Sequence, residues 1–269
     1  MAGASPASSK ADVRSVIRGF AVDYPERFGG IGRCHCPGAS SCRPTSTERH
    51  NVKDIAHFIA GFRRFQEKYF SEDRELFEQL RLGQRPRTMI VACADSRVDP
   101  TLLTGAEPGD VFVVRNVANL VPPHEPGGGF ASVPAALEFA VLSLKVEHII
   151  VLGHAQCGGI NALMSESGTG SEFIGKWVGI AQRARERVLA DLPAKSPALQ
   201  ARACEQAAIL VSLENLMTYP WIAERVVAGA MHLHGWYFDI AQGELSSFNP
   251  ARNGFEPIRA DAAAVSKSE

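Results

Sequence analysis

The sequence TMIVACADSR runs from Thr88 to Arg97, and the sequence HIIVLGHAQCGG runs from His148 to Gly159. Each begins with a short apolar run, Thr88–Ala92 in the first and His148–Leu152 in the second. Runs of this length that are rich in β-branched residues are typical of strands buried in a sheet. A cysteine follows the first strand, and a histidine and a cysteine follow the second.

Helical patterns alternate with these strands. A third apolar run, Val111–Val114, is separated from His148–Leu152 by a helical stretch, Ala131–Leu144. Strands that alternate with helices predict an α/β fold, in which a mainly parallel β-sheet is flanked by helices. Further along, the pattern predicts two helices and then two strands that close a hairpin around Gln242-Gly243, namely Ala198–Met217, Trp221–Ala228, Ala230–Ile240 and Glu244–Phe248.

The chain before the first strand has two parts. Apolar residues recur every three or four positions from Val52 to Tyr69, so they line one face of a helix, and a second helix, Ser71–Leu82, follows. Residues 1–50 are rich in Gly, Ser, Pro and Arg without such periodicity, and we expect a mobile N-terminal extension. We therefore expect one catalytic domain over residues 51–258 and a disordered tail over residues 259–269.

The composition argues against several classes of function. The chain has 269 residues, with 28 Lys and Arg against 29 Asp and Glu and a formal net charge of -1. This balance offers no basic surface for nucleic acid or for an anionic membrane. No stretch approaches the roughly 20 apolar residues that cross a bilayer, and residues 1–10 lack the apolar core of a secretory signal. We expect a cytoplasmic protein that acts on a small molecule.

Six cysteines without an export signal suit free thiols or metal ligands better than a disulfide framework. Cys34, His35, Cys36 and Cys42 offer a second zinc site as an alternative, but ligands separated by one residue or none match no usual zinc-finger spacing. Cys204 lies in an Ala-rich helix and is most simply a core residue.

Cys93, His154 and Cys157 supply two thiolates and one imidazole. That is the ligand set of a catalytic zinc whose fourth tetrahedral position is open for water. In open α/β sheets, bound molecules and ions lie at the carboxyl ends of the strands. Cys93 follows one predicted strand, and His154 and Cys157 follow another, so the three candidate metal ligands are placed there. The alternative of two buried cysteines and a histidine without a metal explains each residue singly, but not their joint placement.

Asp95 and Arg97 lie two and four residues after Cys93, so in an extended chain all three side chains point to one side. An arginine beside a carboxylate lowers the pKa of that carboxylate and orients it through paired hydrogen bonds. We expect Asp95 to be an ionised hydrogen-bond acceptor beside the metal. A salt bridge that only ties down the loop is an equal alternative.

These residues resemble the β-class carbonic anhydrases, which carry Cys-x-Asp-x-Arg after one strand and His-x2-Cys after another. The resemblance extends to the RNVAN of Arg115–Asn119 and the HGW of His234–Trp236, and it covers roughly Val52 to Asn249. It implies the reversible hydration of CO2 to bicarbonate and a proton, by attack of zinc-bound hydroxide on CO2 in an apolar pocket. It also implies one Zn2+ per subunit, with Asp95 and Arg97 as the catalytic pair.

The same resemblance implies a substrate site and a partner. Gln84 matches the family's substrate-orienting glutamine, and the backbone N–H of Gly158 is expected close to the bound anion. Phe112, Val117 and Phe139 match the walls of the CO2 pocket, some of them facing the site of a partner subunit. The family's N-terminal helices lie across a dimer mate, so we expect a homodimer, a tetramer or a larger assembly.

Two positions depart from the pattern of some family members. Their bicarbonate-operated inhibitory site uses a Trp and a Tyr where this chain has Ile90 and Phe238. Arg115 alone is not expected to make that site, so we expect no steep inhibition by bicarbonate.

Two other functions stay open at this point. A hydrolase of carbon disulfide or carbonyl sulfide on the same scaffold would share every zinc ligand and differ in access to the pocket. A non-catalytic, zinc-stabilised binding protein would use Asp95 and Arg97 only to brace the metal loop.

Overall fold

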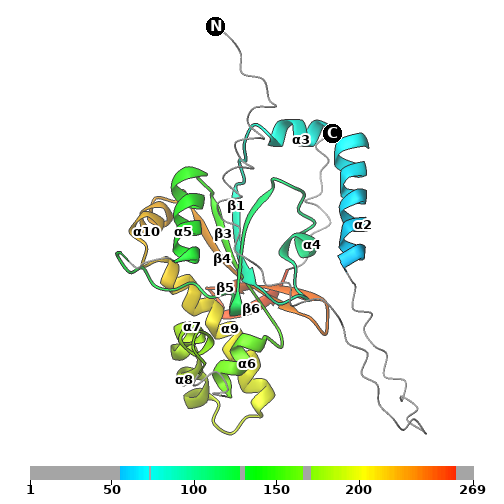
Figure 1. The fold of residues 1–269 in the computed structure, drawn as a ribbon. Helices are drawn as coiled ribbons and strands as arrows, with labels where there is room; N and C mark the ends of the chain where they lie inside the picture. Colours follow the sequence, from blue (N-terminus) through cyan, green and yellow to red (C-terminus); the bar gives the residue numbers. More distant parts are fainter. Residues whose placement is uncertain (1–54, 73, 128–130, 166–170, 259–269) are drawn as a thin grey trace, which may run out of the picture. The chain divides into compact units, whose positions relative to one another are not determined.

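The computed structural model describes residues 55–72, 74–127, 131–165 and 171–258, and the strands among these residues form one six-stranded sheet (Figure 1). Its order is β2-β1-β3-β4-β5-β6. The first four strands in this order pair in parallel, and β5 and β6 join as antiparallel neighbours. The bounds are β1 (Thr88–Cys93), β2 (Val111–Asn116), β3 (His148–His154), β4 (His232–Asp239), β5 (Glu244–Asn249) and β6 (Gly254–Pro257).

Helices precede β1 and occupy the connections from β1 through β4. They are α2 (Ile55–Gln66), α3 (Arg74–Leu80), α4 (Pro100–Thr104), α5 (Ser132–Glu138), α6 (Gly158–Met164), α7 (Ile174–Val178), α8 (Gln182–Asp191), α9 (Pro197–Leu216) and α10 (Pro220–Val227). α2 and α5 each continue into a π-helical turn, Glu67–Glu72 and Phe139–Ser143. The chain divides into two compact units, residues 1–60 and 61–269, and only the start of α2 is described in the first.

Both faces of the central strands are covered, which explains their continuous apolar sequences. Alternate residues of β1 and β3 pack on one face against side chains of α5, α9 and α10; this cluster includes Met89, Val91, Ile149, Val151, Leu137, Ile209 and Ile222. The residues between them pack on the other face with Leu103 of α4; they are Ile90, Ala92, Ile150 and Leu152. The sheet is therefore a rigid platform with helices on both sides.

The register of β1 and β3 decides where the site lies. The two strands are direct neighbours, with Thr88 opposite His148 and Ala92 opposite Leu152. Their carboxyl ends therefore meet at one edge of the sheet, and the loops that follow Cys93 and His154 begin side by side.

The predicted α/β fold with a mainly parallel sheet is confirmed. The three predicted parallel strands are present and end one or two residues later than expected, and the predicted hairpin and the helices around it are present as β4, β5, α9 and α10. The short elements α4, α6, α7 and β6 and the helix α8 were not predicted. The expected domain bounds stay a prediction. The expected extension, the Cys34–Cys42 alternative and the C-terminal tail lie outside the described residues.

Among the described residues, no helix combines the length and the apolar character that crossing a membrane requires.

Candidate metal centre

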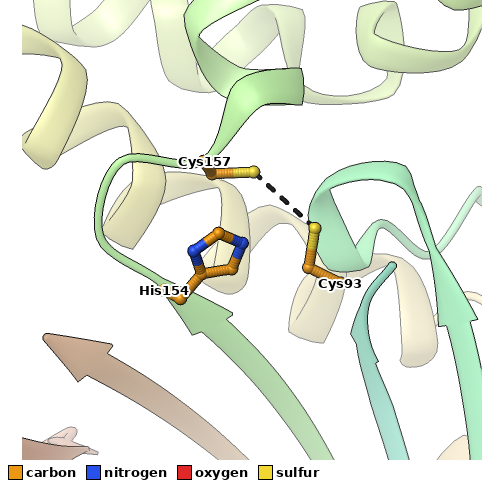
Figure 2. A group of neighbouring side chains, drawn as sticks. All are labelled: Cys93, His154 and Cys157. Carbon is orange, nitrogen blue, oxygen red and sulfur yellow. Dashed lines mark hydrogen bonds between the residues drawn. The ribbon is translucent and has the colours of Figure 1, made fainter. Parts of the chain in front are cut away.

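Two segments far apart in the sequence, one with Cys93 and the other with His154 and Cys157, bring three side chains together at the edge of the sheet (Figure 2). Cys93 is the last residue of β1, His154 is the last residue of β3, and Cys157 directly precedes α6. One ligand atom from each lies within 4.8 Å of the other two, and all three residues are buried. The predicted grouping of these residues is confirmed.

The distance between the two sulfur atoms fits a tetrahedral zinc ion. The two Sγ atoms lie 3.9 Å apart, and two sulfurs bound to one tetrahedral zinc at about 2.3 Å lie about 3.8 Å apart. His154 Nδ1 lies 2.9 Å from the carbonyl oxygen of Ala155, to which it donates in the tautomer that leaves Nε2 as an acceptor. Nε2 is buried and has no hydrogen-bond partner among the described residues, as expected of a ligand atom.

The electrostatics of the group also favour a cation. A hydrogen bond from the Cys157 thiol lowers the pKa of Cys93 despite the opposing effect of burial. The pKa of Cys157 is raised, because its proton bonds to the Cys93 sulfur and because burial disfavours a second anion. Burial lowers the pKa of His154, but the neighbouring Cys93 sulfur, the hydrogen bond to Ala155 O and the charge of Asp95 more than offset this effect, so that the pKa is raised. A divalent metal would allow both thiols to ionise.

Asp95 and Arg97 form a bidentate pair beside the ligands. Arg97 Nε donates to Asp95 Oδ1 at 2.9 Å, and Arg97 Nη2 donates to Oδ2 at 2.7 Å. These bonds hold the pKa of Asp95 well below its usual range. Oδ2 lies 3.8 Å from His154 Nε2. The chain does not stay extended beyond Cys93, because Val98 N–H donates to Asp95 O and closes a turn, yet the carboxylate still faces the ligand group.

Arg115 holds the loop that carries Asp95. Its guanidinium, on β2, donates to three backbone carbonyl oxygens at 2.7–3.0 Å, those of Cys93, Asp95 and Val98. The loop after β1 is thus fixed from the neighbouring strand before any ligand binds.

The loop after β3 is held by residues that the sequence analysis missed. Cys157 N–H donates to Glu205 Oε1 of α9 at 3.0 Å, and the Tyr237 hydroxyl of β4 donates to Glu205 Oε2 at 2.7 Å. Glu205 is buried, and burial raises its pKa. A signal existed in the sequence: Glu205 lies three and seven residues before the buried Ala208 and Ser212, on the inner face of the helix.

The predicted substrate residues are not all near the ligands within one chain. Val117 packs in the same apolar cluster as Cys93 and Cys157, and Gly158 directly follows Cys157. Phe112 contacts Phe139, with ring centroids 5.9 Å apart. Phe112 is opposite Met89, four residues before Cys93 and so about 13 Å from the ligand edge. Gln84 is exposed in the loop before β1.

Residues 88–245 match the family model described as carbonic anhydrase. Two curated relatives come from Arabidopsis thaliana. The chloroplastic β carbonic anhydrase 5 is 44% identical over 195 residues, which are 71% of this chain and 64% of the relative. The mitochondrial β carbonic anhydrase 6 is 40% identical over 209 residues, or 77% of this chain and 70% of the relative. This chain thus spans less than two thirds of the first relative's length.

Two solved structures share the fold. The β-carbonic anhydrase CcaA superposes with a TM-score of 0.71 at 35% identity, over 76% of this chain and 99% of that chain. A β-carbonic anhydrase of the ascomycete Sordaria macrospora, described as tetrameric, superposes with a TM-score of 0.64 at 29% identity, over 72% of this chain and 96% of that chain.

Proposed function

This chain belongs to the β-class carbonic anhydrase family, and from that premise we propose that it hydrates CO2 reversibly to bicarbonate and a proton. The observation that carries the proposal is the convergence of Cys93, His154 and Cys157 on one buried point, with the two sulfurs at the separation expected of zinc ligands. Three protein ligands leave the fourth tetrahedral position to solvent or substrate, which is the pattern of a catalytic and not a structural zinc.

The chemistry divides between the metal and the side chains. Bound zinc would act as a Lewis acid that makes water acidic enough to lose a proton near neutral pH, an effect well established for carbonic anhydrases with three histidine ligands. Asp95 is ionised and faces the ligand group, so it accepts a hydrogen bond from water there and orients it. Arg97 donates to both carboxylate oxygens, and these bonds would keep Asp95 from becoming a further ligand of a bound metal.

The test is CO2 hydration by the purified chain with its metal content measured. The zinc-loaded chain should hydrate CO2, and removal of zinc should abolish the activity. In Asp95→Asn, the amide keeps one acceptor oxygen but presents N–H to Arg97, so the variant should retain zinc and lose about 100-fold or more of its turnover. A zinc-stabilised binding protein would instead show no hydration in the wild type and no change of function in this variant.

Carbon disulfide and carbonyl sulfide are the alternative substrates. Their hydrolysis needs the same ligands, so the three substrates must be assayed side by side on one preparation. We expect the highest kcat/KM for CO2. A higher value for either sulfur compound would reassign the substrate while keeping the metal centre.

We further propose that bicarbonate does not shut this enzyme down steeply. Ile90 and Phe238 are apolar and pack in one cluster, and the Arg115 guanidinium already bonds three carbonyl groups. Neither apolar side chain can donate a hydrogen bond to an anion, and Arg115 also donates to Asp99 Oδ2 at 3.3 Å, so most of its N–H groups are already engaged. Loss of zinc with a sigmoidal dependence on bicarbonate near neutral pH would contradict this proposal.

The N-terminal helix supports a dimer. Four apolar side chains of α2, those of Ile55, Phe58, Ile59 and Phe62, are each between 52% and 73% exposed. We propose that a second copy of this chain covers them, and that Phe112 and Phe139 contribute to the pocket of that copy. Sedimentation of the wild type and of Phe58→Glu tests this: the wild type should be a dimer or larger, and the variant should dissociate.

The cytoplasmic location expected from the sequence stays a prediction. The chloroplast and the mitochondrion in the names of two relatives belong to those proteins. The location of a fluorescent fusion to the C-terminus of the full chain decides between the three compartments.

A further inference from the structure

The peptide unit between Gln156 and Cys157 is held at both ends. Its carbonyl oxygen, on Gln156, accepts a hydrogen bond of 3.1 Å from Arg97 Nη2. Its N–H, on Cys157, donates a hydrogen bond of 3.0 Å to Glu205 Oε1. The peptide bond is trans, so its C=O and N–H groups point in opposite directions. A single peptide plane thus connects the arginine beside the metal site to a carboxylate on α9.

This peptide lies in a turn that needs support. Gln156 has a φ of 58°, in the left-handed region that costs a non-glycine residue conformational energy. Rotation of the plane would break the bond to Arg97 and the bond to Glu205 together. It would also move the Cys157 sulfur, because the Cα of Cys157 is attached to that plane.

Glu205 carries a carboxylate in a buried position, where its desolvation costs free energy. It is 4% exposed, and the groups that donate hydrogen bonds to its carboxylate, among them Cys157 N–H and the Tyr237 hydroxyl, are uncharged. A buried carboxylate that is bonded only to neutral donors is costly, and an apolar side chain at this position would pack at lower cost. Tyr237 is itself 1% exposed, so it holds the carboxylate in one orientation.

We propose that Glu205 is a positioning residue, which acts through the Gln156–Cys157 peptide to fix the Cys157 ligand and the Arg97 guanidinium in one arrangement. The part that concerns Arg97 rests on the proposed function, whereas the part that concerns Cys157 rests on the metal centre alone. Outer partners of metal ligands typically change metal affinity by about 10- to 100-fold when they are removed.

Two variants separate the hydrogen bond from the charge. In Glu205→Gln, the amide oxygen still accepts from Cys157 N–H, and the amide N–H can donate to the Tyr237 oxygen. In Glu205→Ala, both bonds are lost. Glu205→Ala should release zinc to a chelator about 10-fold faster or more, and its cobalt-loaded form should show shifted thiolate-to-metal and d–d absorption bands. Glu205→Gln should stay close to the wild type in both measurements.

Ser212→Ala is the matched control. Ser212 is also fully buried on α9, and its hydroxyl bonds to Val121 N–H and to Asn119 O, not to the Gln156–Cys157 peptide. This variant should lose thermal stability and keep the zinc release rate and the cobalt spectrum of the wild type. If Glu205→Ala does not fold, Tyr237→Phe takes its place, because it frees one side of the carboxylate and should give a smaller change of the same kind.

The proposal is overturned if Glu205→Ala loses stability as Ser212→Ala does, with unchanged zinc release and an unchanged cobalt spectrum. It is also overturned if Glu205→Gln is as impaired as Glu205→Ala, since the hydrogen bond would then not be what matters. A wild type that binds cobalt but does not hydrate CO2 would remove the proposed function and leave these two readouts intact.

Discussion

Zinc should stabilise the folded chain by an amount that follows from the placement of its ligands. The ligand atoms lie within 4.8 Å of one another, on two strand ends and a turn that only the folded sheet brings together, so zinc should bind the native state in preference to the unfolded state. Free zinc at 1,000 times its Kd then adds about 4.1 kcal/mol to the free energy of unfolding. At about 2–4 °C per kcal/mol for a domain of this size, the Tm should rise by about 8–16 °C.

The assay is thermal unfolding followed by circular dichroism in chelator-buffered zinc. Above the Kd, each tenfold increase in free zinc adds about 1.4 kcal/mol, or about 3–6 °C in Tm. His154→Ala removes a ligand and should abolish this dependence, whereas His232→Ala, an exposed histidine at the start of β4, should keep it. A Tm that does not respond to free zinc, or a response that survives in His154→Ala, would refute the assignment of the ligands.

Three further predictions concern other parts of the chain. Asp99 caps α4, and its bonds to Thr101 hold its pKa below the ordinary value. The ionised carboxylate therefore stabilises the fold above the unfolded-state pKa of about 3.9, and this stabilisation is lost as the pH falls through the lower pKa of the folded state. Asp99→Asn keeps a good cap but loses the ion pair with Arg115, so urea denaturation at neutral pH should show a loss of at most about 1 kcal/mol. The variant should lose less stability in acid than the wild type does; equal losses would show that the ionised Asp99 does not contribute. In Gly153→Ala the new methyl would lie 2.7 Å from Ile209 Cδ1, so calorimetry should show about 1–3 kcal/mol of destabilisation. Adding Ile209→Val should reverse part of this loss. If the effects of the two substitutions simply add in the double variant, there is no clash between these side chains. CO2 hydration should rise from neutral to alkaline pH, because two thiolate ligands leave bound water less acidic than three imidazoles do; a flat stopped-flow profile would contradict this.

The sequence predicted the elements whose local pattern and tertiary setting agree. β1 and β3 are buried on both faces, so their apolar, β-branched runs indicate strands without ambiguity, and the ligands at their ends follow from the parallel arrangement. The helix α9 begins at Pro197, and the side chain of Ser196 before it accepts a hydrogen bond from Leu199 N–H. A serine cap and a proline in the first helical position are strong local signals for the start of a helix.

The missed elements are those in which packing overrides local preference. α6 begins with Gly158 and Gly159, which disfavour a helix. A Cβ on Gly159 would lie 2.6 Å from Val117 Cγ1, so this position requires glycine for close approach. The spacing of Glu205 on the inner face of α9 is a sequence signal for burial, but its contact with Cys157 is not predictable, because nothing in the sequence indicates that α9 passes behind Cys157. The expected roles of Gln84, Phe112 and Phe139 in substrate binding stay predictions, because a single chain does not test a pocket to which a second copy contributes.

The two loops of the site are fixed separately and then joined by one residue. Arg115 holds the loop after β1 from β2, and Glu205 holds the loop after β3 from α9. Arg97 donates to Asp95 in its own loop and to the Gln156 carbonyl in the other. A displacement of the Cys157 turn therefore changes the hydrogen bonds of Arg97, and through them the orientation of Asp95. The metal ligand and the carboxylate that faces it are mechanically coupled, so ligand geometry and turnover should change together in variants of either loop.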